Sequence, residues 1–233
     1  MKLLIIMFAV ILNAQVFIAS AANLTYAMPE LIKEFQKKHP DTKIKLILSS
    51  SGKLTAQIMY GAPYDIFLSA NMKYPRALYK KGFAKSKPVV YAEGAIGILS
   101  VKKKVSLEDL PNLKCIAIAN PKTAPYGKAA IEAFKKSGIY NEIKNKLVYA
   151  ETVSAVIPYA VNSCDAGVIS KSSIYSPHIK NIGKFYYTDI PQKLYTPIKQ
   201  GIVLLSDKKD AKEFYDFMLS KEAKKILKKY GYN

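Results

Sequence analysis

The chain has 233 residues, of which 50% are hydrophobic, and a formal net charge of +19. This length suits one large domain or two lobes of roughly 100 residues each, and the apolar content excludes a disordered chain. Arg76 is the only arginine among the 36 positive residues. Lysines spread along the whole chain, without the bidentate arginine fork that reads bases, favour a solvated, anion-attracting surface over a nucleic-acid interface.

The N-terminal segment predicts export. Lys2 precedes the apolar run 3–12, which is too short to span a membrane stably, and no later stretch reaches spanning length. We therefore expect residues 1–14 to be a signal peptide and the mature protein to lie in the periplasm.

Two positions fit the end of this signal. The small residues 19–21 resemble a cleavage site that would leave Ala22 as the first residue. Residues 16–19, however, have the pattern of a short buried strand. We therefore expect cleavage after Ala14, which keeps this strand and makes Gln15 the mature N-terminus.

Short apolar runs alternate with helical patterns along the chain, which predicts an α/β fold with mainly parallel sheets flanked by helices. The expected strands are 16–20, 43–48, 65–69, 94–100, 115–119, 147–150, 166–169 and 201–206. The clearest helices begin near Tyr26 (burying Leu31, Ile32 and Phe35), after Ser51 (Leu54 and Ile58) and near Ala211 (Phe214, Phe217 and Met218).

Two segments, 89–96 and 194–203, are extended and carry little helical signal. They are suitable crossovers, or hinges, between two lobes. The first lobe would then contain residues 15–92 and 200–233, and the second residues 93–199.

The two cysteines enter parallel strands at similar heights. Cys115 lies five residues before Asn120, and Cys164 lies five residues before Ile169. If these strands are neighbours, a disulfide is possible in the oxidising compartment that export implies. Two separate buried thiols are the alternative.

Polar turns follow five of the expected strands, and this is the most informative pattern in the sequence. They occupy residues 21–23, 49–52, 120–127, 151–153 and 170–173. Ligands of parallel α/β sheets bind beyond the carboxyl ends of strands, and helix N-termini favour anions. Ordinary helix capping by Ser, Thr and Asn explains any single turn equally well, but several together indicate an anion site.

Two enzymatic alternatives lack the residues that they would need. Residues 51–54 are not a phosphate-binding P-loop, since the upstream glycine is missing and Leu54 replaces the magnesium-binding Ser or Thr. A serine hydrolase using Ser51 would need a nearby acid or base, and His39 and His178 each stand alone. We expect no catalytic residue, no cofactor and no site for a bare metal cation.

At these turns the sequence resembles the periplasmic molybdate-binding proteins of ABC-type importers. The resemblance covers nearly all of the expected mature chain in order, and its most specific motifs are S-S-G-x-L and G-A-P-x-D-x-F-x-S-A. It is carried by residues 21–28, 49–54, 57–58, 61–70, 119–121, 124–127, 151–153, 165–169 and 229–232.

The resemblance implies a two-lobed clamp of the second periplasmic binding-protein type, with neutral donors around the oxyanion. Asn23 and Ser51 would donate from the first lobe through their side chains. Tyr126 and Val153 would donate from the second through backbone N–H groups, and Tyr126 would also help close the site. Ser170 stands where some relatives place a tyrosine that reaches the ligand, and its shorter side chain puts direct contact in doubt.

The implied function is capture of molybdate, and also tungstate, for a membrane permease, by a monomer that binds no nucleic acid. A site with donors only penalises a protonated anion such as hydrogen phosphate, whose O–H would go unpaired. Sulfate also offers only hydrogen-bond acceptors, so the site must distinguish it from molybdate by size. The alternative function is binding of another oxyanion such as sulfate.

Overall fold

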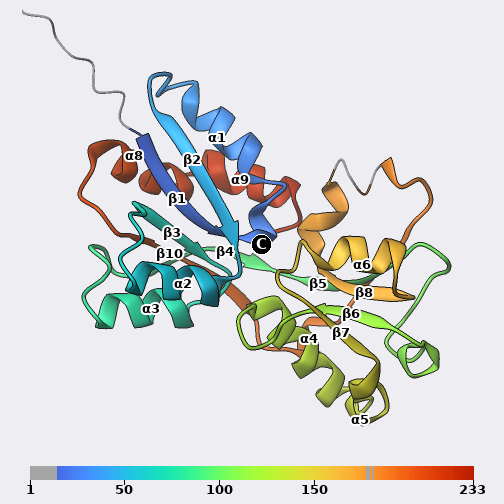
Figure 1. Ribbon diagram of the computed structural model, residues 1–233. Coiled ribbons are helices and arrows are strands. Elements are labelled where there is room, and N and C mark those ends of the chain that lie inside the picture. The colour runs from blue at the N-terminus through green and yellow to red at the C-terminus, as the bar shows by residue number, and fades with distance from the viewer. Residues whose placement is uncertain (1–14, 177–178, 180) are drawn as a thin grey trace, which may run out of the picture.

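The computed structural model describes residues 15–176, 179 and 181–233, so the expected signal peptide and His178 lie outside the described residues. Two sheets form the centres of two lobes (Figure 1). The first sheet has the order β2-β1-β3-β10-β4 and contains β1 (Gln15–Ala21), β2 (Lys43–Ser49), β3 (Ile66–Ser69), β4 (Val89–Gly94) and β10 (Ile198–Leu204). The second has the order β7-β6-β8-β5-β9 and contains β5 (Ile96–Ser100), β6 (Ile116–Ala119), β7 (Leu147–Ala150), β8 (Ala166–Ser170) and β9 (Tyr186–Asp189).

Helices cover both sheets. Those of the first lobe are α1 (Met28–Gln36), α2 (Ser51–Met59), α3 (Lys73–Lys80), α8 (Lys209–Leu219) and α9 (Lys221–Lys229). Those of the second are α4 (Pro125–Lys136), α5 (Tyr140–Ile143) and α6 (Val156–Asn162). Short 3-10 helices are η1 (Ala22–Leu24), η2 (Leu110–Asn112), η3 (Lys144–Lys146), η4 (Lys171–Tyr175) and η5 (Gln192–Leu194). Among the described residues, none of the helices has both the length and the apolar character to cross a membrane.

The sheets are mixed, which corrects the expectation of mainly parallel sheets. In the first, β1 runs parallel to β2 and β3, whereas β10 runs antiparallel to β3 and β4. The second repeats this arrangement, with β6 parallel to β7 and β8, and β5 antiparallel to β8 and β9. The antiparallel strands are those beside the passages between the lobes, where no crossover helix fixes a parallel direction.

The chain passes between the sheets at Ala95, which separates β4 from β5, and returns between β9 and β10. Residues 94–100, expected as one strand, therefore belong to two strands in two different sheets. The edge strand β9 was not predicted, because Tyr186–Asp189 is short and only partly buried.

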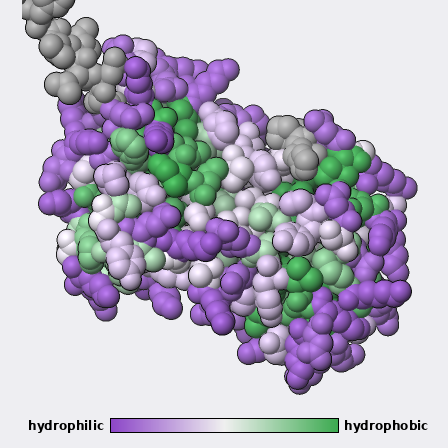
Figure 2. Space-filling view, in the orientation of Figure 1, coloured by the Kyte–Doolittle hydropathy of each residue, from purple (hydrophilic) through white to green (hydrophobic). Residues whose placement is uncertain are grey.

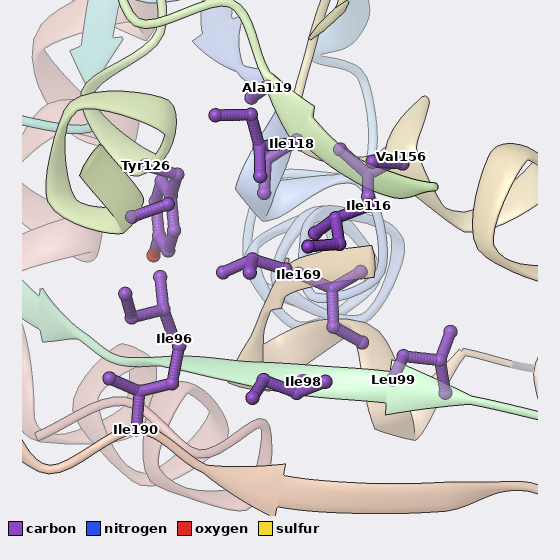
Figure 3. Packing of buried hydrophobic residues seen from close by; sticks show 14 of the residues in the cluster. Ile96, Ile98, Leu99, Ile116, Ile118, Ala119, Tyr126, Val156, Ile169 and Ile190 are labelled. Atoms are coloured by element: carbon purple, nitrogen blue, oxygen red, sulfur yellow. The ribbon is translucent and has the colours of Figure 1, made fainter. Parts of the chain in front are cut away.

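Three hydrophobic clusters fill the lobes, and the expected helices use the expected faces. Leu31 and Phe35 of α1 pack with Phe214 and Met218 of α8 on one face of the first sheet. Leu54 and Ile58 of α2 pack on the other face. In the second lobe, isoleucines of β5, β6 and β8 belong to one hydrophobic cluster with Val156 of α6, and the ring of Tyr126 lies beside Ile96 (Figure 3). Ile32 and Phe217 are only partly buried and lie at the edge of the first cluster.

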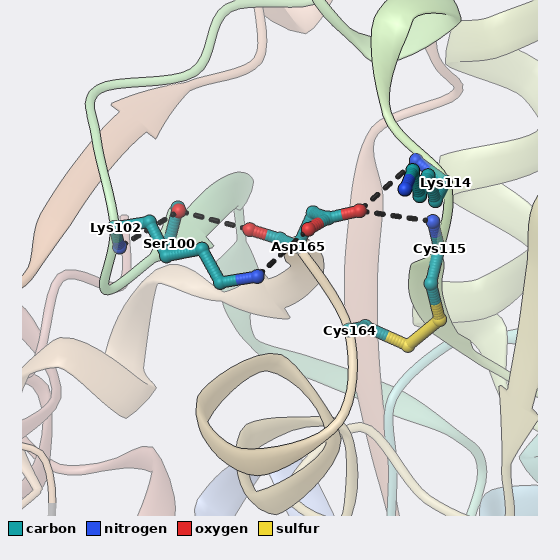
Figure 4. Close-up of polar contacts among 6 residues, drawn as sticks. All are labelled: Ser100, Lys102, Lys114, Cys115, Cys164 and Asp165. Atoms are coloured by element: carbon teal, nitrogen blue, oxygen red, sulfur yellow. Dashed lines mark hydrogen bonds and ion pairs between the residues drawn. A yellow bond between two sulfur atoms is a disulfide. The ribbon is translucent and has the colours of Figure 1, made fainter.

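Cys115 and Cys164 form a disulfide, with their Cα atoms 4.7 Å apart (Figure 4). The sequence had left this pairing open. The bridge lies where β6 and β8 begin, since Ile116 of β6 pairs with Ala166 of β8. Beside it, the Asp165 carboxylate accepts a hydrogen bond from the Lys102 amine at 2.9 Å and one from the Lys114 backbone N–H at 2.9 Å. These bonds lower the pKa of Asp165.

The double variant Cys115→Ser, Cys164→Ser should lose about 4 kcal/mol of free energy of unfolding, because the bridge closes a loop of roughly 50 residues in the unfolded chain. Urea denaturation of the oxidised wild type and the variant measures this difference. Reduced wild type is the matched control and should unfold at the same urea concentration as the variant. Equal midpoints for the oxidised wild type and the variant would contradict the expectation.

Candidate functional site

A small pocket lies where the two lobes meet, at the carboxyl ends of β1, β2, β6 and β7. Its polar lining comes from the polar turns identified in the sequence. The first lobe contributes Asn23, Ser50 and Ser51, and the second contributes Tyr126, Thr152 and Val153. Alanines and Pro125 complete the lining.

Four of the five expected site residues line this pocket, namely Asn23, Ser51, Tyr126 and Val153. Ser170 is placed elsewhere. Its hydroxyl is fully buried and lies 3.0 Å from the Ser172 hydroxyl and 2.8 Å from the Ser173 hydroxyl. The short side chain is thus engaged within its own turn.

Three helix starts lie at the pocket. The η1 helix begins directly after β1, α2 begins after β2, and α4 begins after the turn that follows β6. First-turn N–H groups have no acceptor inside their own helix. In α4 the first residue is Pro125, which has no N–H, so Tyr126 carries the first N–H of this helix.

The two serines at the start of α2 differ in their hydrogen bonds. The Ser51 hydroxyl oxygen accepts from the Ala70 backbone N–H at 3.0 Å, so its own proton remains available for donation. The Ser50 hydroxyl is buried and has no hydrogen-bond partner in the part of the chain that the structure describes. The family resemblance singled out only Ser51. Ser50 is the N-cap residue of α2, yet its side chain makes no capping bond.

Asn23 belongs to a buried polar network that the sequence did not reveal. Its side-chain Nδ2 donates to Gln200 Oε1 at 2.8 Å and to the Tyr232 hydroxyl at 3.0 Å. The Tyr91 hydroxyl also donates to Gln200 Oε1, at 2.7 Å, and Gln200 Nε2 donates to the Tyr126 hydroxyl at 3.1 Å. Asn23 Oδ1 is buried without a partner among the described residues. The available signal was a lone glutamine inside the apolar strand of residues 198–204.

The tyrosines of this network stay protonated. Burial raises the pKa of Tyr91 and Tyr126 well above the ordinary value, and raises that of Tyr232 to about 12. Their hydroxyl groups are therefore neutral donors and acceptors at any physiological pH.

The pocket is electrically neutral although the protein is strongly basic. Of the described residues that line it, none has a charged side chain. The nearest neighbours in sequence, Lys53 and Glu151, form an ion pair of 2.8 Å between the lobes, and both side chains are about half exposed. Hydrophilic residues cover much of the face of the molecule seen in Figure 2.

The lobes touch closely beside the pocket. The Gly52 backbone N–H donates to the Thr123 carbonyl at 2.9 Å. A Cβ atom on Gly52 would lie 3.0 Å from both Cα and the carbonyl oxygen of Thr123, and 2.9 Å from the Tyr74 hydroxyl. On another side, the Ser172 hydroxyl donates to the Asn23 carbonyl at 2.9 Å.

This arrangement is suited to holding an anion. The described residues that line the pocket offer hydroxyl and N–H donors, and none of them carries a carboxylate, imidazole or amine that would activate Ser51 as a nucleophile. His39 lies elsewhere in the first lobe, where it pairs with Glu213 at 3.1 Å and stacks on Phe35.

Residues 16–233 match the family model for bacterial extracellular solute-binding proteins. The chain is 34% identical to the molybdate-binding protein ModA of Rhodobacter capsulatus, over 94% of this chain and 88% of that protein. It is 32% identical to ModA of Azotobacter vinelandii, over 94% and 90% of the two chains. The solved periplasmic molybdate-binding protein of Azotobacter vinelandii superimposes with a TM-score of 0.82 at 28% identity, covering 94% of this chain and 98% of that one. The chain therefore belongs to the family of bacterial extracellular solute-binding proteins.

Proposed function

We propose that the protein binds molybdate and tungstate as fully deprotonated tetrahedral anions and delivers them to the membrane permease of an ABC importer. The observation that carries this proposal is the neutral, donor-rich pocket between the lobes, with buried polar atoms of Asn23 and Ser50 that lack partners among the described residues. The similarity to two molybdate-binding proteins over most of the chain supports the choice of ligand.

The proposed donors come from both lobes. Asn23 and Ser51 donate through their side chains, and Tyr126 and Val153 donate through their backbone N–H groups. The hydroxyl of Ser50 lines the same pocket and adds a further donor. Ser170 supports the turn behind the site rather than the ligand. An anion held from both sides favours the closed form by differential binding, and that form is the one presented to the permease.

The donor set also accounts for selectivity. A site without an acceptor leaves the O–H of hydrogen phosphate unpaired, which costs about 1–3 kcal/mol for a buried polar group. Sulfate carries no proton and is rejected by its smaller size. Molybdate and tungstate are too similar in size and charge for this site to separate them.

We also propose that the chain is exported with residues 1–14 as its signal peptide, acts as a periplasmic monomer without catalysis, and binds no nucleic acid. The strand β1 supports a mature start at Gln15, because β1 pairs with both β2 and β3 inside the first sheet. Cleavage before Ala22 would remove this strand.

Isothermal titration calorimetry of the purified protein against molybdate, tungstate, sulfate and phosphate tests the proposal. We expect tight binding of molybdate and tungstate, and affinities for sulfate and phosphate weaker by about a thousandfold, or roughly 4 kcal/mol. Tightest binding of sulfate would instead support the alternative of a different oxyanion.

Asn23→Asp should weaken molybdate binding by about 3 kcal/mol, a little over a hundredfold, because a charged acceptor replaces a donor facing a dianion. Asn23→Ser is the matched control and should lose about tenfold or less, since a hydroxyl still donates. Titration of both variants by calorimetry separates these outcomes. Affinities equal to that of the wild type in both variants would contradict a ligand role for this side chain.

Gly52→Ala should weaken molybdate binding by about 1–3 kcal/mol, because the added methyl group overpacks the contact with Thr123 when the lobes close. The ligand-free variant should be at least as stable as the wild type, since alanine favours the helix α2. Lys53→Gln removes the neighbouring exposed ion pair and should cost no more than about 1 kcal/mol. Unchanged affinity in Gly52→Ala would show that the lobes do not need this close approach.

A further inference from the structure

Gln200 connects the proposed ligand donor Asn23 to both lobes. It lies on β10, is fully buried, and hydrogen-bonds Asn23, Tyr91 and Tyr126 at 2.8, 2.7 and 3.1 Å. Tyr126 comes from α4 of the second lobe, whereas the other partners belong to the first. Gln200 does not line the pocket itself. Any influence of this residue on the ligand must therefore act through its neighbours.

The orientation of the Asn23 amide decides whether this side chain attracts or repels an anion. Its Nδ2 faces Gln200 and Tyr232, so Oδ1 is the end left toward the pocket that Asn23 lines. A dianion offers only acceptors, and a carbonyl oxygen is an acceptor too. An oxyanion would therefore meet a repulsive dipole unless the amide turned over.

A joint reversal of the two amides, which exchanges the nitrogen and oxygen positions in each, removes this conflict and leaves the neighbouring groups in place. Gln200 Nε2 would then donate to Asn23 Oδ1 and to the Tyr91 hydroxyl, over the present 2.8 and 2.7 Å. The Tyr126 hydroxyl would donate to Gln200 Oε1 over the present 3.1 Å. The Tyr232 hydroxyl would donate to Asn23 Oδ1 over 3.0 Å. These four side-chain contacts are kept with donor and acceptor exchanged, the Tyr232 hydroxyl gives up its bond to the Asn23 carbonyl, and Asn23 Nδ2 faces the pocket.

The backbone of Asn23 remains satisfied in the reversed arrangement. Its carbonyl accepts from both the Tyr232 and the Ser172 hydroxyls, at 2.8 and 2.9 Å. When the Tyr232 hydroxyl donates to the Asn23 side chain instead, the Ser172 hydroxyl still donates a hydrogen bond to the Asn23 carbonyl. The Ser170 hydroxyl, 3.0 Å from that of Ser172, can donate to it in turn.

We propose that Gln200 is a positioning residue that fixes the Asn23 amide with its N–H groups toward the oxyanion, through joint reversal of both amides when the lobes close on the ligand. Glutamine suits this task because one end donates while the other accepts. A glutamate at the same place accepts only, and would hold Asn23 Nδ2 away from the ligand. The proposal rests on the proposed oxyanion-binding function.

A double-mutant cycle tests it, with calorimetric titration of wild type, Gln200→Glu, Asn23→Ser and the double variant. The anion is the tightest-binding member of the molybdate, tungstate, sulfate and phosphate panel. Thermal unfolding confirms that each variant is folded. Residue 23 has no amide to orient in the Asn23→Ser background, so Gln200→Glu should cost about tenfold less affinity there than in the wild-type background.

The two backgrounds separate positioning from simple charge repulsion. A glutamate that acts only by its charge repels the anion equally whether residue 23 is Asn or Ser, and equal losses would overturn the proposal. If the wild type binds an anion and the losses of affinity in the two backgrounds are equal, the proposed function stands and this inference fails. A wild type that binds none of the four anions overturns both.

A second measurement uses the wild type alone and so does not depend on the variants folding. In the anion-bound protein, the Gln200 side-chain NH2 protons should show stronger nuclear Overhauser effects to the Tyr91 ring than to the Tyr126 ring. The reversed amide places Nε2 beside Tyr91, whereas the present orientation places it beside Tyr126. Stronger effects to Tyr126 in the bound state would overturn the proposal.

Discussion

Hydrogen-bond donors from the two lobes converge on one small pocket. Hydroxyl and N–H groups at the ends of β1, β2, β6 and β7 lose their water when the lobes meet, and an unpaired buried donor costs about 1–3 kcal/mol. Closure of an unliganded pocket is therefore opposed by the same groups that favour closure around an acceptor-rich anion. The same hydroxyl and N–H donors thus serve both ligand recognition and lobe closure, and a separate switch is unnecessary.

The net positive charge of the protein does not decide which anion the pocket selects. With a net charge of +19, the surface attracts anions of every kind over long range. A lysine inside the pocket would strengthen binding of protonated and deprotonated anions alike, and so would weaken discrimination. Lys53, the lysine that follows the Ser51 turn most closely, is instead paired with Glu151 at 2.8 Å. Choice among anions is thus left to neutral donors, whose hydrogen-bond geometry distinguishes a proton from a lone pair.

Local patterns in the sequence predicted the parts of the fold that depend on local rules. The strand β1, the helix α1 and the Ser51 turn follow from apolar periodicity and helix-start chemistry. The five site residues were expected from the family resemblance, and four of them lie together in the pocket. The mixed pairing of the sheets and the Gln200 network could not be read this way. Gln200 is 177 residues from Asn23 in the chain, and a lone glutamine in a strand does not indicate which side chains it meets.

The segment that ends the chain joins the site to the passage between the lobes. Tyr232 hydrogen-bonds Asn23 at the pocket, and the next residue, Asn233, exchanges backbone hydrogen bonds of 2.7 and 2.9 Å with Glu93. Glu93 stands two residues before Ala95, where the chain leaves the first sheet, and Gln200 lies on the strand by which it returns. Gln200 is also hydrogen-bonded to Tyr126 of the second lobe, at 3.1 Å. A movement of that lobe relative to the first changes this bond, and through Gln200 it reaches the Asn23 amide, so the orientation of Asn23 and the closed state depend on each other.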